Sequence, residues 1–272
     1  MPLKLGNITY SNCFPVHAGL IDGAVAGGPV LVEGVPSFLN GLLARGEIDV
    51  SPSSSIEYAR HAAGYRIVPD FVIGSRGPVR SILFLAGRDP RELADATVAM
   101  PTASATSVVL LKVLLRKRWG VSPRTVWFDQ AKEDPFAAGA DAALFIGDVA
   151  LRADLYPALP VRLDLGQEWW DHTGLPFAFA VWQASGGSDA ELRRLHGLLL
   201  RSRAHGLEHR AALAEKYAEH FGFSAPFLDA YWRDLSYVLD EPMLEGLNTF
   251  YRYAAEIGEI AEAPVLRWTE RS

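Results

Sequence analysis

Cysteine is almost absent from this chain of 272 residues, which contains only Cys13. One thiol cannot form an internal disulfide or a cysteine-rich metal site, so we expect a reducing compartment. The chain also lacks any apolar run of roughly 18 residues and any leader-like segment before its first expected strand. These absences argue against a helical membrane protein and predict a cytoplasmic location, with no membrane partner.

An excess of positive charge is also missing. The 26 lysines and arginines are outnumbered by 32 aspartates and glutamates, which gives a net charge of −6. Nothing in this balance favours a nucleic-acid partner. The composition, 49% hydrophobic and 21% charged, is ordinary for a globular protein, and the length allows one large domain or two moderate ones.

The common catalytic and phosphate-binding motifs are absent: the sequence has no GxSxG, no P-loop, no dinucleotide-binding GxGxxG and no HExxH. His205 and His209 share a helix face but have no evident third ligand, and we interpret the histidines as surface residues. Cys13 and His17 have the spacing of a thiol nucleophile and its base, although a small buried residue is the favoured interpretation of Cys13. We therefore predict neither a metal nor a cofactor.

Strands and helices alternate through most of the chain. Short apolar runs predict strands at residues 3–8, 29–34, 47–51, 81–87, 96–101, 125–129, 141–147, 161–166 and 175–183. Helical segments are predicted between them at 15–25, 35–46, 54–62 and 104–120. This alternation indicates βαβ units and largely parallel or mixed sheets.

The sequence becomes almost entirely helical from Ser188 onward. Ser188 and Glu191 have the spacing of a capping box, and further helices are predicted at 224–238 and 241–258. Two αβ blocks followed by a return suggest two lobes, with crossings near Ala86–Pro90 and Gly174–Phe177. The first predicted lobe comprises residues 1–86 and 177–272, including the C-terminal helices, and the second comprises residues 87–176. Ligands of such folds bind in a cleft, at the carboxyl ends of strands.

Hydroxyl-bearing residues crowd the places where strands give way to helices. Four such junctions stand out: Thr9–Asn12, Ser51–Ser55, Gly74–Ser81 and Pro101–Ser107. Each hydroxyl has a simple interpretation as a helix N-cap, yet four junctions at equivalent strand ends favour a shared anion-binding cleft. Asp148, next to Gly147, is a predicted N-cap at the same cleft. The residues alone therefore indicate a two-lobed binder of a small anion, with catalysis undecided.

Six ordered blocks between residues 3 and 183 carry a more specific resemblance. The blocks are "LGNITYSNCFPV", "GVPSFLNGLLARGEIDVSPSSSIEYA", "IGSRGPVRSILFLA", "TASATSVVLL", "AALFIGDVALR" and "TGLPFAFAVW". Together they resemble chorismate dehydratase of the futalosine route to menaquinone. The resemblance implies a periplasmic-binding-protein type II fold, with a mixed sheet in each of two lobes and a cleft between them. It also implies a cytosolic lyase that converts chorismate to 3-(1-carboxyvinyloxy)benzoate and water without a metal or organic cofactor.

The same resemblance implies which residues form the site. Asn12 and Ser81 match the key active-site positions of the family. Ser54, Ser55, Thr106 and Ser107 match its ligand-binding junctions. Ser11, Ser104 and Asp148 are added as predicted substrate-binding residues because they lie at the same junctions or cleft. In the implied reaction, Asn12 orients the hydroxyl or ether group of chorismate, Ser81 holds a carboxylate, and a carboxylate of the substrate itself accepts the proton.

Two other functions stay open. The sister enzyme 1,4-dihydroxy-6-naphthoate synthase has a similar fold, but its opening motif and its second-lobe histidine are missing, since no histidine lies between His61 and His172. A non-catalytic cytosolic sensor of a small carboxylate would use the same kind of Asn and Ser site. The residues alone indicate a small anion, and the resemblance implies that this ligand is the small dicarboxylate chorismate. The sequence leaves the oligomeric state undetermined.

Overall fold

The computed structural model describes residues 2–152, 156 and 158–272. The chain folds into two compact α/β units, each built from separate stretches of sequence. Unit 1 comprises Met1–Ile73, Ala180–Asp240 and Pro264–Ser272. Unit 2 comprises Gly74–Phe179 and Glu241–Ala263.

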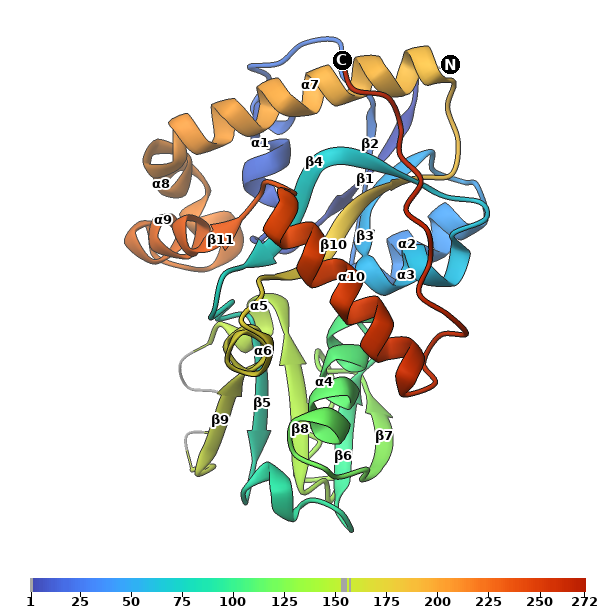
Figure 1. Cartoon of the computed structure of the whole chain (residues 1–272). Helices are drawn as coiled ribbons and strands as arrows, with labels where there is room; N and C mark the ends of the chain where they lie inside the picture. The colour runs from blue at the N-terminus through green and yellow to red at the C-terminus, as the bar shows by residue number, and fades with distance from the viewer. Residues whose placement is uncertain (1, 153–155, 157) are drawn as a thin grey trace. The chain divides into compact units, whose positions relative to one another are not determined.

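A six-stranded mixed sheet forms the centre of unit 1 (Figure 1). Its strands in chain order are β1 (Lys4–Ile8), β2 (Val30–Gly34), β3 (Val50–Ser54), β4 (Arg66–Ser75), β10 (Phe177–Ala184) and β11 (Leu235–Ser236). In space the order is β11-β4-β10-β3-β1-β2. β1 pairs in parallel with β2 and β3, whereas β10 is antiparallel to β3. The carboxyl ends of the three parallel strands therefore share one edge of the sheet.

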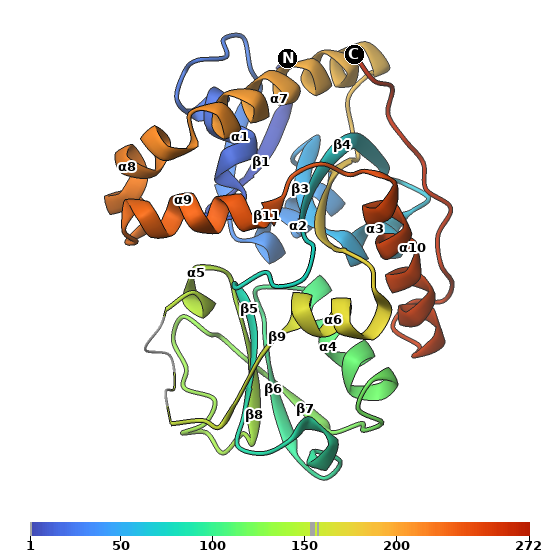
Figure 2. The same cartoon turned by 60° about the vertical axis from the view of Figure 1, so that its left-hand side comes forward.

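Six helices complete unit 1: α1 (Phe14–Ile21), α2 (Pro36–Ala44), α3 (Ser55–His61), α7 (Asp189–Glu208), α8 (Arg210–Phe221) and α9 (Ala225–Asp234). α1 and α7 lie side by side in Figures 1 and 2. The two backbones approach so closely that a Cβ atom at Gly206 would lie 2.0 Å from the Pro15 carbonyl oxygen, and one at Gly19 would lie 2.7 Å from the Ser202 Cα. The predicted capping box of Ser188 and Glu191 is confirmed at the start of α7.

The last nine residues belong to unit 1, where they form a strap that we define as Pro264–Ser272. Trp268 pairs with Ile67 beside β4. The Arg267 amide donates to the Tyr58 hydroxyl at 2.7 Å, and the Arg271 guanidinium binds the Asp70 carboxylate at 2.8 and 3.0 Å. The strap therefore adds backbone and ionic contacts to the unit.

A five-stranded mixed sheet forms the centre of unit 2, in the order β7-β6-β8-β5-β9. These strands are β5 (Ile82–Ala86), β6 (Thr97–Pro101), β7 (Arg124–Phe128), β8 (Ala142–Ile146) and β9 (Val161–Asp164). The unit also contains a 3-10 turn, Pro90–Glu92, and the helices α4 (Thr106–Lys117), α5 (Gly147–Ala150), α6 (Leu165–Thr173) and α10 (Glu241–Glu256). Strand side chains such as Leu85, Phe128 and Phe145 form a buried cluster at its core.

The two mixed sheets agree with the predicted fold class, but the chain changes unit at other places than expected. β5, expected in the first lobe, pairs along its whole length with β8 in unit 2. α10 also belongs to unit 2, because its Phe250 and Tyr253 pack against the fully buried Trp169 of α6. Among the described residues, no helix combines the length and apolarity needed to span a bilayer.

Candidate functional site

One edge of the unit 1 sheet gathers four of the predicted site residues. β1 and β3 are parallel neighbours, so their carboxyl ends lie at the same edge. β1 is followed there by Ser11 and Asn12, while β3 ends at Ser54 and is followed by Ser55. The sequence prediction that these residues belong to one edge therefore agrees with the strand pairing.

Asn12 carries an unsatisfied acceptor at this edge. Its Oδ1 atom is buried and has no hydrogen-bond partner among the described residues. The neighbouring Ser11 is fully buried, and its carbonyl oxygen accepts a 2.8 Å bond from the Trp232 indole, which fixes the turn. A buried polar atom left unpaired costs about 1–3 kcal/mol, so a ligand hydroxyl donating to this oxygen would recover that energy.

The serines of "SPSSS" lie mostly within a strand, not after it as predicted. β3 begins at Val50 and runs through Ser54 before α3 begins. Ser51 packs against Gly6 of β1, where any Cβ atom would come within 2.3 Å of the Ser51 Oγ. Small residues are therefore required at this point of the sheet. This packing requirement is enough to explain Ser51, without a role in ligand binding.

Gln183 of β10 fixes the carboxyl end of β3, a role that no sequence motif indicated. The side-chain amide donates to the carbonyl oxygens of Ser53 and Ser54 at 3.2 and 3.0 Å. These residues are buried. The two bonds hold the strand end from which Ser54 and Ser55 project.

Helix capping, the simple interpretation of these hydroxyls, accounts for Ser104, which accepts from the Ser107 amide in the first turn of α4, but not for Ser54. The N-cap residues of α1, α3 and α4 are Cys13, Ser54 and Ala105, and none of these side chains makes a capping hydrogen bond. Ser54 is thus a buried hydroxyl at a helix start that does not cap the helix. The prediction that the serines cap α3 is therefore wrong for Ser54.

One edge of the unit 2 sheet gathers the remaining predicted residues. Ser81 immediately precedes β5, and its carbonyl oxygen accepts a 2.8 Å bond from the Gly147 amide at the end of β8. β6 runs parallel to β8, so its carboxyl end reaches the same edge. The predicted residues at this edge are Ser81, Ser104, Thr106, Ser107 and Asp148.

The hydroxyls after β6 interact with one another. The Ser104 hydroxyl donates to the Ser107 hydroxyl at 3.1 Å and accepts from the Ser107 amide at 3.3 Å. Thr106 and Ser107 are buried in the first turn of α4. This arrangement aligns hydroxyls with the positive end of a twelve-residue helix.

Asp148 is not the helix N-cap that the sequence suggested. Ile146 occupies the N-cap position, and Asp148 lies in the first turn of the short α5. The preceding strand end is fixed by Gln130, whose side chain donates to the Ile146 carbonyl at 3.1 Å and accepts from the Ile146 amide at 3.0 Å. Gln130 was not predicted, because it lies 16 residues away in sequence and belongs to no motif.

Ser81 is almost completely buried, at 1% exposure, and follows a turn tied to α6. The Asp164 carboxylate accepts hydrogen bonds from the Val79 amide at 3.0 Å and from the Arg80 amide at 2.5 Å. It also accepts from the amides of Gly166 and Gln167 at 2.9 and 3.2 Å as the N-cap of α6. Burial raises the pKa of Asp164, while these four amide donors act in the opposite direction.

The Cys13 and His17 pair is unsuited to nucleophilic catalysis. Both residues are fully buried, and burial raises the pKa of the Cys13 thiol to about 12. His17 uses Nδ1 with Asn7 and Nε2 with Trp182, which leaves neither ring nitrogen for the thiol. His196 is buried as well, so the interpretation of the histidines as surface residues is wrong for these two.

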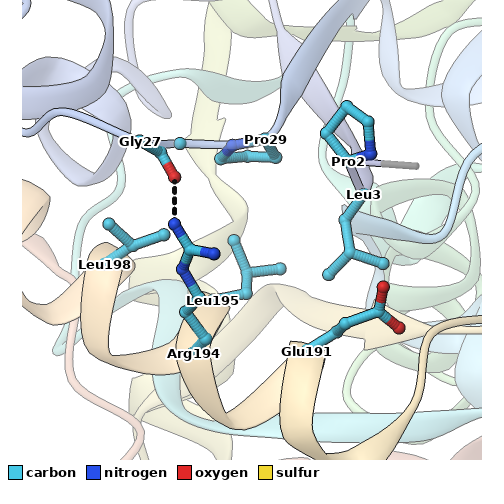
Figure 3. Close-up of a pocket in the computed structure, with 9 residues that line it drawn as sticks. Pro2, Leu3, Gly27, Pro29, Glu191, Arg194, Leu195 and Leu198 are labelled. Atoms are coloured by element: carbon cyan, nitrogen blue, oxygen red, sulfur yellow. Dashed lines mark hydrogen bonds between the residues drawn. The ribbon is translucent and has the colours of Figure 1, made fainter.

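Within residues 2–152, 156 and 158–272, no three His, Cys, Asp or Glu side chains lie close enough together to hold a metal ion. A pocket of about 260 Å³ does exist in unit 1 (Figure 3). It is lined by Leu3, Pro29 and the α7 side chains Arg194 and Leu198, among others. Leu3 and Pro29 precede β1 and β2, so this pocket lies at the amino ends of those strands, opposite the hydroxyl-rich edge.

Comparison with known proteins places these features in a family. Residues 3–256 match a family model described as menaquinone biosynthesis. A chorismate dehydratase from Thermus thermophilus is 36% identical over 265 residues, which cover 92% of this chain and 94% of that protein. The match therefore includes both units and both sheet edges.

Solved structures show the same fold at low sequence identity. A protein from Archaeoglobus fulgidus superposes with a TM-score of 0.80 at 18% identity, covering 95% of this chain and 98% of its own. The periplasmic aliphatic sulphonate binding protein of Escherichia coli gives a TM-score of 0.66 at 15% identity, covering 96% and 89%. The fold is therefore that of periplasmic binding proteins.

Proposed function

The chain belongs to the menaquinone-biosynthesis family of chorismate dehydratases, and from this premise we propose that it converts chorismate to 3-(1-carboxyvinyloxy)benzoate and water. The observation that carries this proposal is the 36% identity to a curated chorismate dehydratase along nearly the whole of both chains. The proposed enzyme is a carbon–oxygen lyase of the cytoplasm, a location that the single cysteine supports.

The reaction needs the removal of one proton and one hydroxyl group. Loss of the ring proton at the carbon that bears the ether leaves an electron pair that is delocalised toward the ring carboxylate. The neighbouring hydroxyl group then takes up the proton that was removed from the ring and leaves as water, which completes the aromatic ring. A carboxylate of the substrate accepts the ring proton, so the protein's main task is to bind and orient one conformer.

The two sheet edges supply groups suited to that task. In unit 1, the buried Asn12 Oδ1 accepts a hydrogen bond from the departing hydroxyl group or otherwise orients the ether side. In unit 2, the buried Ser81 hydroxyl exchanges its long 3.4 Å bond to the Val79 carbonyl oxygen for a bond to a substrate carboxylate. The other predicted contacts, which bind carboxylate and hydroxyl oxygens, are Ser11, Ser54, Ser55, Ser104, Thr106, Ser107 and Asp148.

Incubation of the purified protein with chorismate, followed by mass spectrometry, tests the reaction. We expect a product lighter than chorismate by one water, formed equally well in the presence of a chelator. Ser81→Ala removes the donor to the carboxylate, and Asn12→Asp adds a charge that repels the dianion, so each should lower kcat/KM by about 100-fold or more. Ser122→Ala, an exposed serine of unit 2, is the matched control and should leave turnover unchanged.

The outcomes separate the proposed enzyme from a sensor. Tight binding of chorismate without any product would contradict the dehydratase and favour a binding protein. Product formation that persists undiminished in both site variants would leave the reaction standing but remove Asn12 and Ser81 from it.

A further inference from the structure

Asp164 joins two segments that lie far apart in the sequence. Its carboxylate caps α6 through the amides of Gly166 and Gln167, and it binds the amides of Val79 and Arg80, which lie 85 and 84 residues away. Arg80 is the residue directly before Ser81. One side chain therefore determines both where α6 begins and where the turn before Ser81 ends.

That turn is strained and tightly confined. Arg80 adopts a left-handed conformation with φ of +65°, which is unfavourable for a residue other than glycine. Gly166 must be glycine, because a Cβ atom there would come within 2.6 Å of the Gly77 carbonyl oxygen and 2.7 Å of the Ser75 hydroxyl oxygen. The conformation of Arg80 persists only while neighbouring groups hold it, and the two backbone bonds to Asp164 do so.

A carboxylate is the side chain that this junction requires. Four amide hydrogens point toward its two oxygens, and an ionised carboxylate offers acceptors in every direction without a donor. An asparagine would place its NH₂ group against at least one of those amides. A serine could still cap α6, but it is too short to reach the turn as well.

We propose that Asp164 is a positioning residue for Ser81 in the dehydration of chorismate. It holds the Val79–Arg80 turn so that the Ser81 hydroxyl stays where it meets the substrate carboxylate. This inference rests on the proposed function, because it assigns to Ser81 a contact with substrate.

A double-mutant cycle tests the proposal. Asp164→Ser and Asp164→Asn keep a capping side chain on α6 and should lower kcat/KM about 10- to 100-fold, the loss expected from a displacement of about 1 Å. In a Ser81→Ala background the same substitutions should change kcat/KM less than about twofold, since residues that act through one another are not additive. Equal losses in both backgrounds, or no effect of Ser81→Ala alone, would overturn the proposal.

Two further measurements separate positioning from general destabilisation and from failure of the proposed function. Asp134→Asn alters another aspartate of unit 2 that accepts two backbone amides, and this control should leave kcat/KM unchanged. Hydrogen exchange at the amides of Arg80, Ser81 and Ile82 should accelerate in Asp164→Ser. Unchanged exchange there contradicts the positioning role even if the wild-type protein does not turn over chorismate, while faster exchange without wild-type turnover would contradict only the proposed function.

Discussion

His17 shows what complete burial does to a single titratable side chain in unit 1. Its Nδ1–H donates to the Asn7 side-chain oxygen at 2.9 Å, and its Nε2 accepts from the Trp182 indole at 3.1 Å. The bond from Trp182 requires Nε2 without a proton, and burial lowers the pKa of His17 to about 3. Sequence alone indicated a thiol partner or a surface residue, because neither Asn7 nor Trp182 forms a motif with it.

We expect His17 to make unit 1 less stable as the pH falls. The unfolded chain binds a proton near pH 6.5, whereas the folded protein does so only near pH 3. The stabilisation is therefore complete above the unfolded pKa and is lost as the pH falls from about 6.5 toward about 3, by up to about 1.4 kcal/mol per pH unit. Urea unfolding at several pH values gives the free energy of unfolding as a function of pH. This free energy should fall more steeply with decreasing pH for the wild type than for His17→Gln, and an equal fall in both would contradict the prediction.

The residues predicted for the site were found through their types and junctions, and those missed depend on contacts across the chain. Ser81 and Asn12 belong to recognisable blocks. Gln130, Gln183 and Asp164 act on backbone atoms between 16 and 130 residues away. A single sequence carries no signal for such bonds, and residues 161–166, which include Asp164, were predicted only as a strand.

At the scale of elements, periodicity predicted most strands and helices, and the failures have physical causes. β4 was not predicted, since Pro69 and Asp70 interrupt its apolar pattern and Asp70 has φ of +71°. That aspartate is stabilised by His196, 126 residues later, and by Arg271 of the strap. β3 was predicted to end too early, because serines and proline are poor strand formers that burial here overrides.

A glycine-to-alanine substitution should have opposite effects on stability at Gly206, where α7 contacts α1, and at Gly41 of α2. Gly206→Ala would place a Cβ atom 2.0 Å from the Pro15 carbonyl oxygen, and we expect it to cost about 2 kcal/mol or more by forcing the helices apart. Gly41→Ala, inside α2, meets only the flexible end of Arg45 at 3.2 Å. It should stabilise the protein by about 0.5–1 kcal/mol.

Thermal unfolding of the two variants measures this difference. A melting temperature that rises for Gly41→Ala and falls for Gly206→Ala fits the packing described. Since α1 begins two residues after Asn12, we also expect Gly206→Ala to weaken chorismate binding. Two variants with the same melting temperature would be incompatible with the close approach of α1 and α7.

At the scale of the whole molecule, the order of elements predicted two mixed-sheet units but not the membership of each element. Sequence order placed α10 with the helices before it, whereas aromatic packing on Trp169 places it in unit 2. The strap then returns to unit 1. The unit to which a helix belongs depends on which apolar faces pack together. Periodicity in the sequence shows only that a helix has an apolar face, not what that face packs against.

The strap should contribute measurably to stability. Deletion of residues 264–272 removes the bonds to Tyr58, Ile67 and Asp70. It also removes the packing of Thr269, which is 5% exposed. We expect a loss of at least about 2 kcal/mol, or a fall in melting temperature of roughly 4–8 °C. Arg271→Ala alone removes one exposed ion pair and should cost less than about 1 kcal/mol; an equal loss in both variants would show that the backbone contacts contribute nothing.

The strand order of unit 1 also has a consequence for synthesis on the ribosome. β10 lies between β3 and β4, and β11 pairs with β4 on its other side. While the ribosome translates residues 74–179, the emerging chain therefore presents β4 with neither neighbour and β3 with one open edge. Exposed strand edges invite wrong pairing. We therefore expect the nascent chain to be open to wrong strand pairing until β10 is synthesised, and the strap can join unit 1 only once residues 264–272 have emerged from the ribosome.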